Sequence, residues 1–297
     1  MEKFKQLMKK FSTLCKKNKL ATAVTSICLV LVVALASVMV YFIKNPLLIY
    51  TTFEDYDTTG WANSDDGAMT YTAEDARSIK VAGWNEASYG IDVSKHNGKI
   101  DWEKVAAEGI DFVMIRCGYR GCASGEIVKD IQFDNNIKGA AANGIPIGVY
   151  FYSTAITPEE AEEEAAFVCS EIRKHEKNGI KITYPIAYDF EEFYNDEYTR
   201  AGGLTREQLT ENTVAFLDII DGAGYIPMLY ASKSAVSAYW DFGPISGYDF
   251  WLAHYTANTS FTGSFMMWQY TCKGRVDGIY NYVDFNVARY VVNDDYV

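Results

Sequence analysis

Two acidic residues at the end of a predicted strand are the part of this sequence best suited to chemistry. The segment Tyr184–Glu192, YPIAYDFEE, is an apolar run that ends in Asp189 and Glu191. Alternate residues of a strand point to one side, so these carboxyl groups share a face, with their Cα atoms roughly 6.6 Å apart. Two carboxylates so close cannot both ionise freely, and one pKa rises. A carboxylic acid with a raised pKa beside an ionised carboxylate is the pair that glycoside hydrolysis uses. A solvated Asp-x-Glu at a strand end is the alternative.

The elements that position these acids follow from the hydrophobic pattern after Tyr89. Apolar runs predict strands over Tyr89–Ser94, Asp111–Cys117, Pro146–Tyr152, Tyr184–Glu191, Ile226–Ala231, Phe250–Tyr255, Met266–Thr271 and Val283–Phe285. Amphipathic stretches predict helices over Asp101–Glu108, Asp130–Asn143, Pro158–Asn178 and Thr205–Ala223. Apolar strands that alternate with helices indicate a parallel sheet with both faces covered. The predicted fold is α/β: an irregular TIM-like β/α barrel with helix-poor last strands. A doubly wound open sheet is the alternative, and it predicts a helix after every late strand.

Four acids are expected on one rim of this barrel, because catalytic groups of parallel barrels lie at the carboxyl ends of the strands. Asp92 lies near the end of the first predicted strand, and Asp189 and Glu191 end the fourth. Asp284 lies in the last strand, which neighbours the first if the barrel closes. We predict catalytic roles for Asp92, Asp189 and Glu191, and a substrate-binding role for Asp284. A turn cap at Asp92 and an ordinary strand-end acid at Asp284 are the alternatives.

Aromatic residues mark the same rim. The chain has 22 Tyr, and its aromatics in or just after strands are Tyr119, Tyr150, Tyr152, Tyr188, Tyr230, Trp251, Tyr255, Trp268 and Tyr270. Sugar rings stack on such side chains, and phenol hydroxyls bind sugar hydroxyls. The residues predicted to bind substrate are Tyr119, Tyr150, Tyr188, Tyr230, Trp251 and Trp268.

Other chemistries are disfavoured. The three histidines show no H-x-x-x-H spacing, so neither a metal site nor any other cofactor is predicted. His175 lies in a charged stretch and is expected to be solvated, whereas His96 and His254 are expected to form hydrogen bonds near the rim. A serine hydrolase is disfavoured because no G-x-S-x-G follows a strand.

The N-terminal segment predicts a membrane anchor. Leu20–Ile43 is an apolar run of 24 residues without a charge, long enough to span a bilayer with some tilt. Seven lysines precede it, and only Lys44 follows closely, so the N-terminus is expected in the cytoplasm and the rest outside. A cleaved signal peptide is the alternative, although its apolar region is usually about 7–15 residues.

This anchor divides the chain into four parts. We predict a cytoplasmic basic tail over 1–19, a transmembrane helix over 20–43, an extracellular stalk over 44–88 and a catalytic barrel over 89–297. The formal net charge of −12 becomes −19 for residues 45–297 once the +6 of residues 1–19 and Lys44 are removed. So acidic an outer part excludes nucleic acid as its partner.

Disulfides are permitted outside the cell. The outer cysteines are Cys117, Cys122, Cys169 and Cys272. Cys117 and Cys169 are expected to be small buried residues, and a bridge between Cys122 and Cys272 is left open, as are the other pairings.

Several motifs resemble glycoside hydrolase family 25, the Chalaropsis-type lysozymes. They occur in the family's order as Gly90–Trp102, Phe112–Arg116, Gly144–Tyr152, Pro185–Glu191, Phe250–Tyr255, Met267–Tyr270 and Val283–Asn286. The resemblance implies an irregular α/β barrel that cleaves the β-1,4 bond between N-acetylmuramic acid and N-acetylglucosamine in peptidoglycan, with catalytic acids at Asp92, Asp189 and Glu191. The chain departs from the family at Arg116–Gly121, where many members have K-A-T-E-G.

We therefore expect a membrane-anchored N-acetylmuramidase, single-pass, that acts on peptidoglycan glycan strands outside the cell. Glu191 is expected to donate the proton and Asp189 to stay ionised, with Asp92 assisting. Two alternatives remain: a weakly catalytic glycan-binding module, and a remodelling subunit of an envelope-spanning machine with further protein partners.

Overall fold

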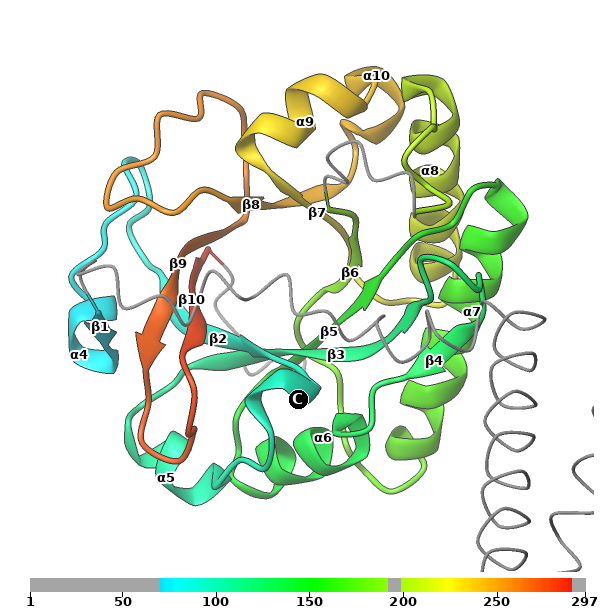
Figure 1. The fold of residues 1–297 in the computed structure, drawn as a ribbon. Helices are drawn as coiled ribbons and strands as arrows, with labels where there is room; N and C mark the ends of the chain where they lie inside the picture. Colours follow the sequence, from blue (N-terminus) through cyan, green and yellow to red (C-terminus); the bar gives the residue numbers. More distant parts are fainter. Residues whose placement is uncertain (1–69, 192–198, 290–297) are drawn as a thin grey trace, which may run out of the picture. The chain divides into compact units, whose positions relative to one another are not determined.

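The structure, a computed structural model, describes residues 70–191 and 199–289. Within these ranges a ring of strands is surrounded by helices (Figure 1). The ring consists of β2 (Ser88–Val93), β3 (Phe112–Arg120), β5 (Ile147–Tyr152), β6 (Ile186–Asp189), β7 (Pro227–Ser232), β8 (Asp249–Ala253), β9 (Met267–Arg275) and β10 (Val283–Ala288). All eight coincide with predicted strands.

The ring is closed. Parallel pairs run from β2 through β3, β5, β6, β7 and β8 to β9. The antiparallel strand β10 lies between β9 and β2 and completes the barrel. The prediction that the last strand lies next to the first is confirmed, and the open-sheet alternative is wrong.

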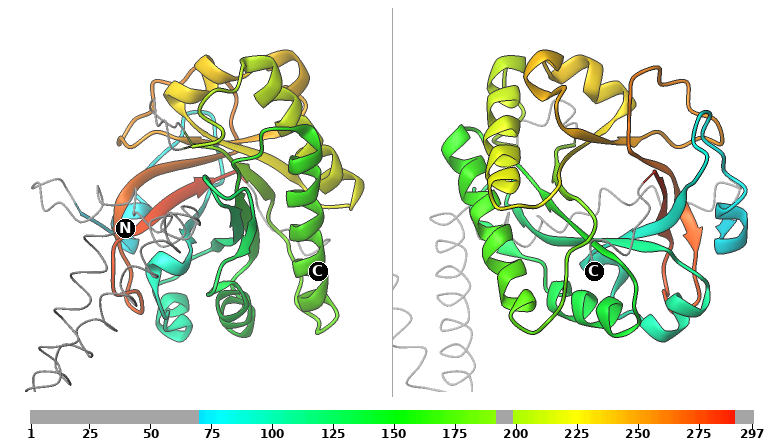
Figure 2. Two further views of the ribbon diagram at one scale, coloured as in Figure 1. Left: turned by 45° about the vertical axis from the view of Figure 1, so that its right-hand side comes forward. Right: turned by 180° about the vertical axis from the view of Figure 1, so that it is seen from behind.

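Helices cover the outside of the ring (Figure 2). They are α5 (Trp102–Ala107), α6 (Phe133–Ala142), α7 (Pro158–Glu176), α8 (Arg206–Gly222), α9 (Lys233–Tyr239) and α10 (Phe242–Ile245). The first four were predicted. Helix α7 begins where expected, because the Thr157 side chain accepts a hydrogen bond from the Glu160 amide and Pro158 needs no partner for its nitrogen. The segments that join β8 to β9 and β9 to β10 contain no helix, so the barrel is helix-poor at its last strands, as expected.

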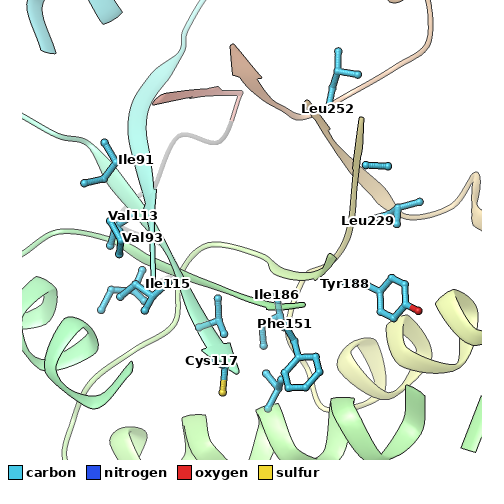
Figure 3. Packing of buried hydrophobic residues seen from close by; sticks show 14 of the residues in the cluster. Ile91, Val93, Val113, Ile115, Cys117, Phe151, Ile186, Tyr188, Leu229 and Leu252 are labelled. Carbon is cyan, nitrogen blue, oxygen red and sulfur yellow. The ribbon is translucent and has the colours of Figure 1, made fainter. Parts of the chain in front are cut away.

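Strand alternation produces two apolar layers. Outward-facing side chains such as Ile91, Val113 and Ile115 are fully buried beneath the helices (Figure 3). Inward-facing side chains fill the barrel floor, where Phe112 stacks on Tyr184 with ring centroids 4.5 Å apart. The floor closes one end of the barrel interior, and polar groups are left for the other end.

Residues 70–88 belong to the barrel domain rather than to a stalk. Strand β1 (Tyr71–Thr72) pairs with the end of β9, and helix α4 (Ala73–Ala76) is capped by Thr72. Trp84 packs against Phe265, with ring centroids 5.5 Å apart. The predicted boundary at residue 88 is therefore placed too late, because the mixed composition of this segment hid its short apolar contacts.

The remaining predictions for the N-terminal part lie outside the described residues. These are the basic tail, the span over 20–43 and the first part of the stalk. No helix in the ranges 70–191 and 199–289 is long and apolar enough to cross a membrane.

Cys117, Cys169 and Cys272 carry free thiols. Cys117 and Cys169 are buried, as predicted, and Cys122 and Cys272 are partly exposed. The bridge between Cys122 and Cys272 that the sequence left open does not form.

Candidate active site

Four carboxyl groups meet at the end of the barrel where the parallel strands finish. Asp92 lies near the end of β2, Asp189 ends β6, and Asp284 lies near the start of β10, opposite Asp92 in the ladder. Asp92 and Asp189 are only 7% and 4% exposed, whereas Glu191 and Asp284 are partly exposed. The structure thus brings together the four acids expected on one rim, and we call them the acid cluster.

Burial raises the pKa of every member of the acid cluster, and repulsion from a neighbouring carboxylate adds to the rise in three of them. Burial is the largest cause in each case, because the charged form loses its hydration. It raises the pKa of Asp92 to about 6, although two amide groups that donate hydrogen bonds to this carboxylate lower it. The negative charge of Glu191 contributes to the raised pKa values of Asp92, Asp189 and Asp284.

Within the pair at the end of β6, both carboxyl groups have raised pKa values. Burial and the charge of Glu191 raise the pKa of Asp189 well above its usual range. Burial also raises the pKa of Glu191, and the positive charge of Arg116 opposes that rise. Both carboxyl groups of the pair therefore favour the protonated form, and which of them stays ionised remains a prediction from the sequence, which names Asp189. A hydrogen bond donated to Asp189 favours its ionised form and leaves the proton to Glu191.

Asp92 is held by two amide side chains from neighbouring strands. Its Oδ2 accepts hydrogen bonds from Gln269 Nε2 at 2.9 Å and from Asn286 Nδ2 at 2.8 Å. Both amides are buried inside the barrel, at 4% and 0% exposure. These residues position an ionised carboxylate at the rim.

Arg116 supplies the positive charge of the site. Its Nε donates to Asp130 at 2.8 Å, and Asp130 also accepts a hydrogen bond from the Lys95 amide. The buried atoms Arg116 Nη2 and Asp189 Oδ1 make no hydrogen bond with the described residues. An unused donor and an unused acceptor are thus left beside the acid cluster.

Three of the predicted aromatics line the barrel interior next to these groups. Tyr150 and Tyr230 are each 9% exposed, and both pack edge-on against Trp251, at 5.9 and 4.7 Å between centroids. Trp251 is fully buried, and the rings of the two tyrosines pack against it. Tyr119 is partly exposed, and its ring lies 5.5 Å from the Arg116 guanidinium.

Two predicted substrate-binding residues do not reach the site. Tyr188 is fully buried and packs on Phe216 of α8, at 5.2 Å between centroids (Figure 3). Trp268 is also buried in the outer layer and donates a hydrogen bond to the His254 carbonyl. Both predictions are wrong for one reason: these residues alternate with Asp189 and Gln269, which face inward, so their own side chains face outward.

Sequence reasoning missed Arg116, Gln269 and Asn286, and it did not choose Tyr255 as a binding residue. The first three are polar residues at inward positions of otherwise apolar strands, and that is the signal that identifies them. Tyr255 follows β8, is 56% exposed, and donates a hydrogen bond to Gln269 Oε1 at 3.1 Å.

His175 and His254 lie in different surroundings. His175, expected in solvent, is 4% exposed and lies 2.8 Å from Asp134 with its ring edge-on to Phe133. It is buried where it contacts Phe133 and Asp134 at the start of α6. His254 forms a hydrogen bond with Thr259.

An α/β barrel with a cluster of buried and partly exposed carboxyl groups at the carboxyl ends of its strands suits glycoside hydrolysis, which uses paired carboxyl groups. The profile of the glycosyl hydrolases family 25 matches residues 91–279, and the chain belongs to that family.

Solved structures and a curated protein are similar to this chain. The modular autolysin LytC of Streptococcus pneumoniae is 28% identical with a TM-score of 0.61, covering 75% of this chain and 50% of LytC. The chain therefore spans half the length of that protein. A family 25 glycosyl hydrolase from Bacillus anthracis shares the fold, with 22% identity, a TM-score of 0.53 and coverage of 70% and 90%. The uncharacterized protein YegX of Escherichia coli O157:H7 is 27% identical over 203 residues, 67% of this chain and 68% of YegX.

Proposed function

We propose that this glycoside hydrolase is an N-acetylmuramidase that cleaves the β-1,4 bond between N-acetylmuramic acid and N-acetylglucosamine in peptidoglycan. The observation that carries the proposal is the acid cluster, in which a deeply buried carboxyl group lies beside a more exposed one at the rim. Support also comes from LytC, whose structure has been solved with a synthetic peptidoglycan ligand at 27% identity to this chain.

The buried unpaired atoms fit the acetamido group of the sugar. Among the described residues Asp189 Oδ1 has no donor and Arg116 Nη2 has no acceptor, and an amide offers one of each. When the acetamido N–H donates to Asp189, the ionised form of Asp189 is favoured. The shared proton then moves to Glu191, which becomes the general acid.

The reaction proceeds in two steps. Glu191 protonates the leaving oxygen while the acetamido carbonyl oxygen, oriented by Asp189, attacks the anomeric carbon and the glycosidic bond breaks. A water molecule then attacks the same carbon and gives its proton to the Glu191 carboxylate, while the bond from this carbon to the acetamido oxygen breaks and the acetamido group is restored, so the product keeps its configuration. Such substrate assistance is a recognised variant of the two-carboxylate mechanism.

Asp92 and Asp284 act through charge and hydrogen bonds. Asp92, ionised and held by two amides, stabilises positive charge that develops on the sugar ring. Asp284, opposite Asp92 in the ladder, binds sugar hydroxyl groups. Tyr150, Tyr230 and the exposed Tyr255 line the sugar-binding face.

Product analysis tests this function. Purified peptidoglycan is digested with the full-length chain, and the new reducing ends are labelled by borohydride reduction. A muramidase creates reducing ends on N-acetylmuramic acid. Reducing ends on N-acetylglucosamine overturn the assignment, and wall binding without products favours a glycan-binding subunit of a larger envelope assembly.

We further propose that residues 20–43 anchor the protein in the cell membrane with the barrel outside. The apolar run and the seven lysines before it support this orientation. A protease added to intact protoplasts is expected to release a fragment that starts within residues 45–69. Protection of the barrel contradicts the orientation, and a mature chain that starts after Ile43 shows a cleaved signal instead.

A further inference from the structure

The hydrogen bonds around Asp92 form two successive shells with a fixed direction. In the inner shell Gln269 and Asn286 each donate an amide N–H to Asp92 Oδ2. In the outer shell Trp251 Nε1 donates to Asn286 Oδ1 at 2.8 Å. Tyr230 donates to Gln269 Oε1 at 2.9 Å, and Tyr255 donates to the same oxygen at 3.1 Å.

This direction is set by donor chemistry. The indole N–H of Trp251 is only a donor, so the Asn286 oxygen must face it and the Asn286 N–H group must face Asp92. Turning the Asn286 amide would break the bond to Trp251 and leave a buried indole N–H unsatisfied. Gln269 is fixed less strictly, because a phenol hydroxyl can donate or accept; in the orientation found, its oxygen accepts two phenol hydroxyl groups.

An ionised carboxylate is only an acceptor, and it matches these two donors. A protonated Asp92 would need an acceptor for its own proton, and the Asn286 amide cannot turn to provide one. Asp92 Oδ1 makes no hydrogen bond with the described residues, and it remains available to a ligand.

We propose that Gln269 and Asn286 are positioning residues that keep Asp92 ionised and hold its second oxygen available for substrate. The Trp251 donor locks Asn286 in that orientation, and the hydroxyl groups of Tyr230 and Tyr255 favour the same orientation of Gln269. The inference rests on the proposed function only for the part that Asp92 plays in glycan cleavage. That the two amides hold Asp92 in its ionised form does not depend on the proposed function.

Other titratable groups also affect the pKa of Asp92. They favour its protonated form, which the two amides oppose. Glu191 at the end of β6 raises its pKa, and burial raises it more. Further groups that share charge interactions with Asp92 are Asp189, Asp284, Tyr150, Tyr230, Tyr255 and Cys272. Because other carboxyl groups lie near Asp92 and oppose its negative charge, its ionisation depends on the two amides.

Two variants test the amides in the full-length chain: Gln269→Met, which keeps the length of the side chain, and Asn286→Leu. Met267→Leu is the matched control, because Met267 also faces inward on β9 and is fully buried. The first measurement needs no activity. The melting temperature is recorded at pH 4 and pH 8, and the decrease caused by each amide variant is expected to be larger at pH 8, where Asp92 is ionised.

The second measurement is the pH profile of wall lysis. Loss of one charge-assisted hydrogen bond is expected to move the acid limb of kcat/KM upward by about one pH unit. Tyr255→Phe should move it less, because Tyr230 still donates to Gln269. The control Met267→Leu should leave the limb in place.

The outcomes separate the inference from the proposed function. Equal decreases in melting temperature at both pH values overturn the positioning role, whatever the activity. A larger decrease at pH 8 in a protein without lytic activity supports the positioning role and refutes the muramidase. An acid limb that stays in place in both amide variants of an active protein overturns the inference.

Discussion

The substitution Asp92→Asn is expected to stabilise the protein at neutral pH while it removes activity. The pKa of Asp92 is raised from 3.8 to about 6 in the folded chain. The folded state therefore binds more protons than the unfolded state between these values, and the free energy of unfolding falls as the pH rises through this window. Above the window, ionised Asp92 destabilises the fold, and an asparagine of the same shape does not.

The magnitude follows from the size of the shift. A rise of roughly two pKa units at about 1.36 kcal/mol per unit corresponds to about 3 kcal/mol at pH 7. For a domain of about 150–250 residues, each kcal/mol changes the melting temperature by about 2–4 °C. Asp92→Asn is thus expected to raise the melting temperature by about 6–12 °C, and its oxygen can still accept an amide hydrogen bond.

The assay is thermal unfolding of the full-length wild type and variant between pH 3 and pH 8. The difference should be full above pH 6 and should disappear as the pH falls below 4, where the wild-type carboxyl group is protonated. Asp277→Asn is the control, since this exposed side chain lies 3.7 Å from Lys104 in an ion pair of little energetic weight. A variant that is no more stable than the wild type at pH 7, or a difference that does not change with pH, refutes the reasoning.

Three further predictions concern the charged groups around the site. Glu191→Gln should lower the rate of wall lysis by about 10²–10⁴-fold with an unchanged circular dichroism spectrum, because general acid catalysis contributes that much; near-normal lysis would contradict the assignment. Arg116→Met should move the alkaline limb of the pH–rate profile upward, because the positive charge of Arg116 lowers the pKa values of Asp189 and Glu191; a profile with an unmoved alkaline limb would exclude this role. Arg120→Met should destabilise the fold by about 3–5 kcal/mol in urea unfolding at pH 8, because it leaves buried Glu164, 2.7 Å from Arg120, without its cation. The double variant with Glu164→Leu should recover most of that loss, and no recovery would argue against an unpaired buried charge.

The strands and helices of the barrel could be predicted because their signals are local. Each apolar run is short and bounded by polar residues, and Thr157 with Pro158 marks the start of α7 through contacts within one helical turn. Closure of the barrel followed from counting the strands. The short elements β1 and α4 escaped prediction because they gain stability only by packing on β9 and the core, which local pattern does not reveal.

The candidate site was predicted in part. Asp189 and Glu191 stood out because period-two alternation places them on one face, and the motif around Asp92 pointed to a partner on the same rim. The same alternation, applied to Tyr188, would have placed it under α8 rather than in the site. The error came from reading proximity to Asp189 along the chain as proximity in space.

The sequence by itself determined the barrel and the identity of the acids, since both depend on periodicity and residue type within short segments. Only the tertiary structure decided which groups hold those acids. Asp92 meets Gln269 and Asn286 across 177 and 194 residues of chain, and such contacts arise only when β10 inserts between β9 and β2. The order in which the carboxyl groups lose their protons also depends on how deeply each is buried. Burial depth is a property of the closed barrel and not of any single strand.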